Sequence, residues 1–501
     1  MQDTDAIYDI AVVGAGINGV GIANDAVGRG LSVFVCEKDD LASHTSSASS
    51  KLIHGGLRYL EQKEFRLVRE ALAEREVLLA KAPHIIRPMR FIMPHRPHLR
   101  PAWLIRTGLF FYDHLGKRKK LSGSNNVYFK ADSPLNAAIT RGFEYSDCAV
   151  DDARLVVLNA MHAREKGAEI MTRTRCVSAR REGSLWVVDL ENVNGQFQIK
   201  AKALVNAAGP WVAKFIQQDL QLQSPYGIRL IQGSHIIVPK LYDGEKAFIM
   251  QNDDRRIVFA IPYLDHYTMI GTTDREYQGD PAQVEITQDE IDYLLKVSNA
   301  HFKQQLSQAD IISTFSGVRP LCDDESDNPS AVTRDYTLAL SQQDDQAPLL
   351  SVFGGKLTTY RKLAESAMQQ LKAFFPEMSG SWTATEALPG GENMESVEQL
   401  IQEIYAQVTD ASEDLVKRWA SAYGSRIWNI LGEKSSVEQL GQHFGQGLYA
   451  REVDYLCTAE WVTTSQDVLW RRSKLGLSFT QKESEALDAY LIVKTHSNEA
   501  A

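Results

Sequence analysis

The chain contains few cysteines and no long hydrophobic run, and each scarcity excludes a class of protein. Its 501 residues include five cysteines, which are widely scattered and form no Cys-x-x-Cys pair. An odd, dispersed set of this kind predicts neither a disulfide framework nor a zinc site, and we expect no metal. No run of 18 apolar residues occurs, and the polar start lacks the basic and apolar regions of a leader. We therefore expect neither a membrane-spanning helix nor secretion.

Positive charge is also in short supply. The 54 Lys and Arg residues face 64 Asp and Glu residues, which gives a formal net charge of -10. A negative molecule repels phosphate backbones, so nucleic acid is not an expected partner, and an anionic substrate must meet local cations. A length of 501 residues with 44% hydrophobic content is enough for more than one globular domain.

Residues 8–37 predict a strand-helix-strand unit around a glycine turn. Apolar runs at 8–13 and 31–36 flank a helical pattern at 17–26. Between the first strand and the helix lies Gly14-Ala15-Gly16-Ile17-Asn18-Gly19, which has the spacing GxGxxG. Glu37 ends the second strand.

Each part of this fingerprint has a mechanical reason in a dinucleotide site. Gly14 permits the tight turn, Gly16 lets the backbone approach a pyrophosphate, and Gly19 lets the helix pack on the strand. Glu37 can accept hydrogen bonds from ribose hydroxyls, while the helix N-terminus favours the anion. The alternative is a glycine-rich loop that binds no ligand, but the strand, the helix and the acidic residue together favour dinucleotide binding.

Two later segments favour FAD over NAD, which the fingerprint alone does not separate. Residues 204–209 form a strand-like run that ends in small residues, as expected where a chain passes close to a cofactor. Residues 354–359 precede a helical pattern, so a second helix N-terminus could face a flavin ring and stabilise negative charge there. An ordinary turn before a helix remains the alternative for this second segment.

The remaining sequence patterns predict three structural parts of the chain. Strand-like runs at 203–206, 235–238, 257–261 and 268–271 suggest a second sheet threaded between parts of the nucleotide domain, and amphipathic helical patterns recur after residue 390. We expect residues 1–389 to hold an FAD-binding domain (parts near 1–80, 145–215 and 345–385) interleaved with a cap (parts near 81–144 and 216–344), followed by a helical domain at 390–501.

Longer motifs carry a far more specific signal than the glycine fingerprint. They are GAGINGVGIANDAVGRGLSV, TSSASSKLIHGGLRYLE, GFEYSDCAVDDARLV, NAAGPWV, GIRLIQGSHI, IGTTDREYQGDP, SGVRPLCDDES and SVFGGKLTTYRKLAE. With these motifs the chain resembles, over nearly its whole length, the FAD-dependent glycerol-3-phosphate dehydrogenases of the bacterial aerobic type. The resemblance implies an α/β (α+β) fold, in which a glutathione-reductase-type, Rossmann-like FAD domain carries an interleaved mixed β-sheet substrate domain and a C-terminal helical domain.

The resemblance also implies a reaction. Such an enzyme oxidises sn-glycerol 3-phosphate to dihydroxyacetone phosphate by hydride transfer to noncovalently bound FAD, and passes the electrons to a membrane quinone, either ubiquinone or menaquinone. The expected cofactor-binding residues are Gly14, Gly16, Asn18, Gly19, Glu37, Thr45, Ser46, Ser50, Val177, Ala208, Gly209, Gly354, Gly355, Lys356, Leu357 and Thr358.

A phosphate dianion that binds beside a flavin needs positively charged hydrogen-bond donors in a fixed geometry, and the planar guanidinium of arginine supplies two parallel N–H donors. Arg58 with the adjacent Tyr59, and Arg319, are the leading candidates, and Arg334 is a weaker third. An arginine chosen at random more often forms a surface salt bridge, but flanking glycines and prolines favour function for the first two. Lys356 completes the expected substrate-binding set, because a fixed cation there would lower the pKa of the reacting hydroxyl.

His54 is the expected general base, because an imidazole titrates near working pH. The alternatives are a structural histidine bonded to backbone and a covalent link to FAD. Lys356 and Arg319 complete the expected catalytic set, and His235 is a lesser candidate that is expected to be structural.

Residues 85–121 predict a membrane contact. The segment holds nine Lys or Arg residues against Asp113, interleaved with apolar and aromatic residues. We expect a cytoplasmic protein that docks peripherally on the cytoplasmic face of the inner membrane, with a second copy of the chain in a homodimer as a further expected partner. The alternative is that the apolar part belongs to the core. For the activity, the alternatives are an FAD oxidase that uses oxygen, or an amine- or amino-acid-oxidising enzyme of the same fold.

Overall fold

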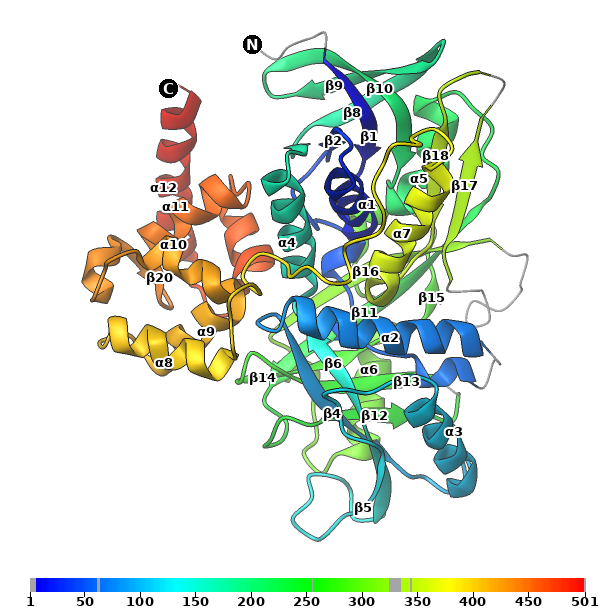
Figure 1. Ribbon diagram of the computed structural model, residues 1–501. Coiled ribbons are helices and arrows are strands. Elements are labelled where there is room, and N and C mark those ends of the chain that lie inside the picture. Colours follow the sequence, from blue (N-terminus) through cyan, green and yellow to red (C-terminus); the bar gives the residue numbers. More distant parts are fainter. Residues whose placement is uncertain (1–5, 61–63, 255, 324–334, 343–344, 500–501) are drawn as a thin grey trace.

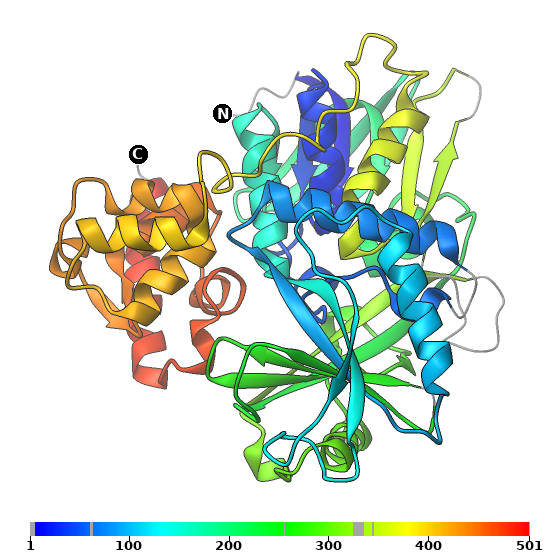
Figure 2. The ribbon, with the colours of Figure 1, turned by 60° about the horizontal axis from the view of Figure 1, so that its bottom comes forward.

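The computed structural model describes residues 6–60, 64–254, 256–323, 335–342 and 345–499, apart from the side chains of Arg58 and residues 495–499. Two β-sheets lie one above the other, and helix α2 (Phe65–Lys81) runs across the junction between them (Figure 1). A group of C-terminal helices stands to one side of both sheets in the two ribbon views (Figure 2).

The first sheet has the strand order β17-β18-β10-β1-β2-β7, in which β18, β10, β1, β2 and β7 are parallel and β17 is antiparallel to β18, and the antiparallel pair β8-β9 is attached through β10. Because the C-terminal part of β1 (residues 10–13), β2 and the C-terminal part of β10 (residues 203–206) are continuously buried, the centre of the sheet is covered on both faces. Its strands are β1 (Ile7–Val13), β2 (Val33–Cys36), β7 (Glu169–Met171), β8 (Arg175–Glu182), β9 (Leu185–Asn192), β10 (Gly195–Asn206), β17 (Thr337–Ser341) and β18 (Leu349–Phe353).

Three helices cover one face of this sheet. Helix α1 packs between α4 and α7, and their apolar sides form the largest hydrophobic cluster with the strands below. Their bounds are α1 (Ile17–Gly28), α4 (Asp152–Glu165) and α7 (Tyr360–Leu371), and a short helix α5 (Val212–Lys214) follows β10.

The second sheet has the order β15-β11-β14-β13-β12-β4-β6-β3, with β16 paired to β11 and β5 to β6. Its pairings are antiparallel except for that of β12 with β4, so the sheet is mixed, as expected. Its strands are β3 (Leu52–Ile53), β4 (Ile86–Pro94), β5 (Asn125–Tyr128), β6 (Arg141–Val150), β11 (Ile228–Pro239), β12 (Ala247–Gln251), β13 (Ile257–Tyr263), β14 (Tyr267–Gly271), β15 (Arg275–Glu276) and β16 (Ser313–Cys322).

Helices α2 and α3 (Ala102–His114) pack near one face of this second sheet, and α6 (Gln288–His301) contributes to the core on the other. Helix α6 begins with a capping box, in which Thr287 and Glu290 satisfy each other's backbone N–H groups. Segment 85–121 therefore contains a strand, β4, and a separate helix, α3.

The C-terminal helices bury a hydrophobic cluster of their own, centred on Trp419. They are α8 (Val397–Gln407), α9 (Glu413–Tyr423), α10 (Ile427–Leu431), α11 (Ala450–Ala459), a π-helical turn (Asp467–Arg472) and α12 (Gln481–Glu499), with a small hairpin of β19 (His443–Gly445) and β20 (Leu448–Tyr449). The expected fold class is confirmed. The division of the chain at residue 390 and the interleaved boundaries stay predictions. None of the described helices combines the length and the hydropathy that crossing a membrane requires.

Candidate active site

The glycine turn after β1 has no room for side chains. Gly14 has φ +101°, and a Cβ there would lie 2.6 Å from the carbonyl oxygen of Ala207 in the neighbouring strand's extension. A Cβ on Gly19 would lie 1.9 Å from the carbonyl oxygen of Gly14. The turn therefore brings backbone N–H groups and the N-terminus of α1 close to the sheet edge, where an anion can approach them.

A cavity of about 340 Å³ opens at this turn. It is lined by Gly14, Gly16, Glu37 and residues 42–46, and on the opposite side by residues 174–176 and 207–211. The Glu37 carboxylate accepts hydrogen bonds from the backbone N–H groups of Ala15 (2.8 Å) and Asp39 (3.0 Å), and burial raises its pKa. A glycine cradle at a helix N-terminus with an acid at the next strand end fits the diphosphate and ribose of a dinucleotide.

The serine-rich segment closes one side of this cavity. Ser46 Oγ accepts a hydrogen bond from the Ile17 N–H (3.0 Å), and Thr45 Oγ1 donates one to the carbonyl oxygen of Val318 (2.8 Å). Ala208 and Gly209 line the cavity, and Val177 follows the lining residue Cys176 in β8. Ser50 lies elsewhere, with its hydroxyl 3.0 Å from His235 Nε2.

A second glycine turn approaches the same helix from the other side. Gly354 and Gly355 have φ +77° and +99°, and a Cβ on Gly355 would lie 2.7 Å from Asn18 Nδ2. The Asn18 amide donates to the Gly354 carbonyl oxygen (3.1 Å), which ties the two turns together. A 3-10 turn, Leu357–Thr359, then leads into α7, and the Thr358 hydroxyl accepts a long hydrogen bond from the His54 N–H (3.4 Å).

Four predicted substrate-site residues meet near a second cavity of about 320 Å³. His54 and Tyr59 line it together with Thr272 and Asp274. Lys356 Nζ lies 3.9 Å from the centroid of the Tyr59 ring. The Arg319 guanidinium donates to Asp274 Oδ1 (2.5 Å) and to Thr272 Oγ1 (2.8 Å), so its direction is fixed.

Two other predicted residues have no described side-chain position, and a third, His235, has a structural environment. Arg334 and the side chain of Arg58 lie outside the described residues. His235 is buried, stacks on Phe315 with ring centroids 4.6 Å apart, and has a pKa well below its usual value, mainly because of burial. These contacts favour a structural role for His235.

Sequence reasoning missed Thr272 and Asp274. The signal for them was present, since both belong to the motif IGTTDREYQGDP at the end of β14, but nothing in the motif shows that Arg319 lies across the sheet from it.

Comparison with known proteins adds independent observations. A family described as FAD dependent oxidoreductase matches residues 9–361, and the C-terminal domain of alpha-glycerophosphate oxidase matches residues 381–495. A glycerol-3-phosphate dehydrogenase of Pseudomonas tolaasii is 68% identical over 487 residues, which is 97% of this chain and 95% of the relative. The chain belongs to the FAD-dependent glycerol-3-phosphate dehydrogenase family.

Further members and neighbours agree with this family. A D-erythritol 1-phosphate dehydrogenase of Brucella abortus is 50% identical over 487 residues, 95% of this chain and 96% of the relative. The structure of a glycerol-3-phosphate dehydrogenase from Bacillus halodurans, complexed with FAD, matches with a TM-score of 0.74 and 25% identity over 98% of this chain and 95% of its own. The predicted family, the oxidoreductase class and FAD as cofactor are confirmed.

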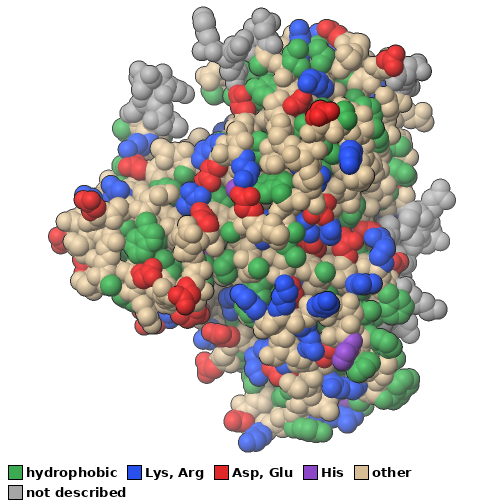
Figure 3. Space-filling view, in the orientation of Figure 1, with side chains coloured by type: hydrophobic (Ala, Val, Ile, Leu, Met, Phe, Trp, Pro, Cys, Tyr) green, Lys and Arg blue, Asp and Glu red, His purple; other side chains and the backbone are tan. Residues whose placement is uncertain are grey.

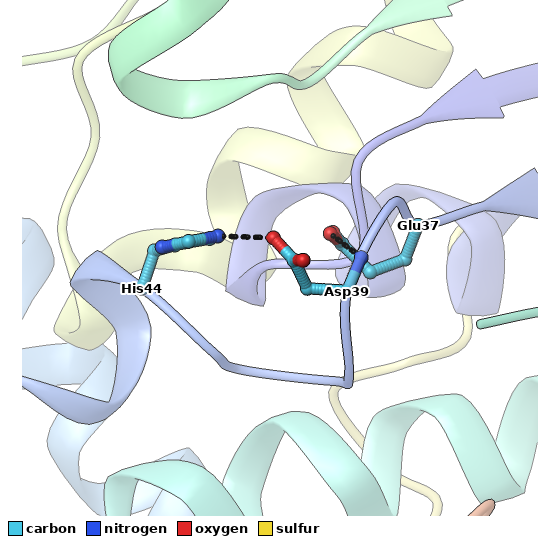
Figure 4. Close-up of side chains that lie close together, drawn as sticks. All are labelled: Glu37, Asp39 and His44. Atoms are coloured by element: carbon cyan, nitrogen blue, oxygen red, sulfur yellow. Dashed lines mark hydrogen bonds and ion pairs between the residues drawn. The ribbon is translucent and has the colours of Figure 1, made fainter. Parts of the chain in front are cut away.

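In this member of the glycerol-3-phosphate dehydrogenase family, Glu37, Asp39 and His44 form the group of potential metal ligands found among the described residues (Figure 4). Their ligand atoms lie within 4.8 Å of one another, and His44 Nε2 lies 2.7 Å from Asp39 Oδ2. The bond to His44 is the largest influence that holds the pKa of Asp39 below its usual range. Because the Glu37 carboxylate already accepts hydrogen bonds from backbone N–H groups, we interpret Glu37, Asp39 and His44 as residues that support the shape of the cofactor-binding loop.

Proposed function

We propose that this protein oxidises sn-glycerol 3-phosphate to dihydroxyacetone phosphate. The observation that carries the proposal is the convergence of His54, Tyr59, Lys356 and Arg319 around Thr272 and Asp274, next to the turn that faces the cofactor cleft. A base, two fixed cations and an enclosed space are what the oxidation of a phosphorylated alcohol needs.

Bound FAD would supply the acceptor for the hydride. Among the chain's own groups, the His54 imidazole would accept the hydroxyl proton. Lys356 would lower the pKa of that hydroxyl, and Arg319 would hold the phosphate, assisted by Arg58, Tyr59 and Arg334. The contact between Lys356 and the Tyr59 ring supports this assignment, because it fixes the ammonium group at the site.

A direct test is anaerobic bleaching of the bound flavin. Glycerol 3-phosphate should bleach it at concentrations where glycerol, lactate and amino acids do not. D-Erythritol 1-phosphate is the second candidate substrate, because it is the substrate named for the Brucella abortus relative. Faster bleaching by that compound would transfer the assignment to it, and bleaching by an amino acid alone would overturn both.

Electrons would leave toward a membrane quinone, either ubiquinone or menaquinone. The cavity at His54 supports this proposal, because it continues between apolar side chains as far as α3. Its outer lining includes Leu104, Gly108 and Phe111 of that helix. An apolar passage suits a lipid-dissolved acceptor better than a charged soluble one. Rapid oxygen consumption without added quinone would instead favour an oxidase.

Helix α3 supports peripheral docking on the cytoplasmic face of the inner membrane. Its inner face is buried, but Trp103, Leu104, Phe110 and Phe111 are 70%, 43%, 55% and 47% exposed, so the core interpretation is wrong for these four. Figure 3 shows hydrophobic and basic side chains together over this part of the molecule. Exposed apolar residues on a helix that is flanked by cations are typical of interfacial binding.

Changing Lys117, Arg118, Lys119 and Lys120 together to Gln should reduce co-sedimentation with anionic liposomes while leaving activity with a soluble dye intact. The matched control replaces two exposed lysines elsewhere, Lys372 and Lys482, by Gln and should sediment normally. If liposome binding does not change when the four basic residues are replaced, when salt is added or when Phe110 and Phe111 are substituted, the docking surface lies elsewhere. A homodimer, the other proposed partner, would show in the mass measured in detergent.

A further inference from the structure

The loop that carries Glu37 is bonded to the C-terminal part of the chain. Asp40, three residues after Glu37, is 2% exposed, and its carboxylate accepts a bidentate pair of bonds from Arg472 (2.7 and 2.8 Å). Arg471 Nε donates a third bond to the same carboxylate (2.6 Å). Both arginines belong to the π-helical turn Asp467–Arg472, more than four hundred residues further along the chain.

The same turn also holds the opposite wall of the cavity. Asp467 accepts a bond from Arg173 Nη2 (2.6 Å), and residues 174–176 line the cofactor cavity. The Asp467 carboxylate is itself fixed by the backbone N–H groups of Thr463 and Thr464 (3.0 Å each). One short C-terminal segment thus contacts segments that line two sides of the cofactor cavity.

Further bonds anchor this segment. Lys474 Nζ lies 2.6 Å from Asp151 Oδ2 at the start of α4. Arg472 also donates to the Glu460 carbonyl oxygen (2.6 Å), and the Glu460 carboxylate pairs with Arg154. The Arg472 side chain is fully buried, so its charge is compensated by protein groups alone. Removing one partner from such a network leaves a buried charge uncompensated, and the backbone must move to solvate it.

We infer that residues 467–474 act as a clamp that shapes the FAD site from outside, with Arg472 as its main positioning residue. Arg472 contacts neither the cofactor cavity nor the substrate residues; it acts through Asp40 and the loop that presents Glu37, Thr45 and Ser46. The C-terminal helices therefore contribute to retention of FAD. This inference rests on FAD dependence and not on the identity of the substrate.

The test measures release of FAD from the purified holoenzyme by the rise in flavin fluorescence after dilution. Arg472→Met should release FAD at least tenfold faster than the parent. The control is Arg418→Met, which breaks another arginine pair, with the buried Glu452, inside the C-terminal helices and away from the loop. Arg418→Met should release FAD within twofold of the parent, even where its thermal midpoint falls as far.

A second readout separates positioning from general damage. With excess FAD, Arg472→Met should regain the parent's kcat with an unchanged KM for substrate. Arg471→Gln changes a side chain that is 17% exposed and removes only one of the three bonds to Asp40, so it should release FAD a few-fold faster than the parent. This variant tests the inference even if Arg472→Met does not fold. Parental release rates in the variants that fold, or equal acceleration by Arg418→Met, would overturn the inference.

Discussion

Replacing Arg319 by Met should weaken the binding of glycerol 3-phosphate through two separable effects. The first is the loss of charge-assisted hydrogen bonds to the phosphate, worth about 1.5–3 kcal/mol each, or roughly tenfold per 1.4 kcal/mol. The second comes from Asp274, which is bonded to Arg319 at 2.5 Å and would lose the positive charge of that guanidinium. A carboxylate roughly 7 Å from a phosphate, at an effective dielectric constant of about 20, adds ~2 kcal/mol of repulsion per unit charge.

Arg319→Met alone should therefore raise the apparent dissociation constant several hundredfold or more, and adding Asp274→Asn should recover about tenfold or more. The assay is an anaerobic titration of flavin absorbance with glycerol 3-phosphate, with FAD content checked first. Arg180→Met, which breaks the pairs of a half-exposed arginine with Glu182 and Asp189 in the first sheet, is the control and should bind normally. A dissociation constant within threefold of the parent, or no recovery in the double variant, would refute the reasoning.

Four further outcomes are expected. Acid precipitation should leave the flavin in the supernatant, and flavin retained on the precipitated protein would indicate a covalent bond at His54. His54→Ala should slow flavin reduction about a hundredfold or more, and a normal rate of reduction would show that His54 is not the base. Gly233→Ala places a Cβ 2.3 Å from Arg319 Nη2, so substrate affinity should fall while FAD stays bound, and an unchanged KM would contradict this. Burial lowers the pKa of His84 from 6.5 to about 3, so the unfolded state binds the extra proton. Stability should therefore fall as pH drops below 6.5, by about 1.4 kcal/mol per unit down to the folded pKa, and His84→Gln should flatten this slope in thermal melts.

Local patterns predicted the cofactor cradle well. GxGxxG between an apolar strand and a helix describes a turn that is complete within about thirty residues, and the structure has β1, α1 and β2 there. The amphipathic helical patterns expected after residue 390 include α9, whose apolar side is buried in the C-terminal cluster, because amphipathic spacing is a short-range property.

Contacts between distant segments could not be predicted in this way. Arg319 was selected for its flanking glycine and proline, but its partner Asp274 becomes visible only when β11 brings β14 and β16 together as its neighbours. The clamp on Asp40 is still less visible, because Arg471 and Arg472 look like ordinary surface charges in the sequence, and Arg472 becomes buried only when the C-terminal helices dock. The exposure of four apolar residues on α3 likewise depends on which side of the helix meets the second sheet.

The order of strands in the first sheet has a consequence for biosynthesis. Strand β10 separates β1 from β18, and β18 is translated about 340 residues after β1. At roughly 5–20 residues per second, the nascent sheet waits on the order of half a minute with an open apolar edge. The residues that hold the cofactor loop from behind emerge later still. FAD therefore meets a finished pocket only after the segment at 467–472 has been translated, and we expect yields of folded enzyme to depend strongly on chaperones.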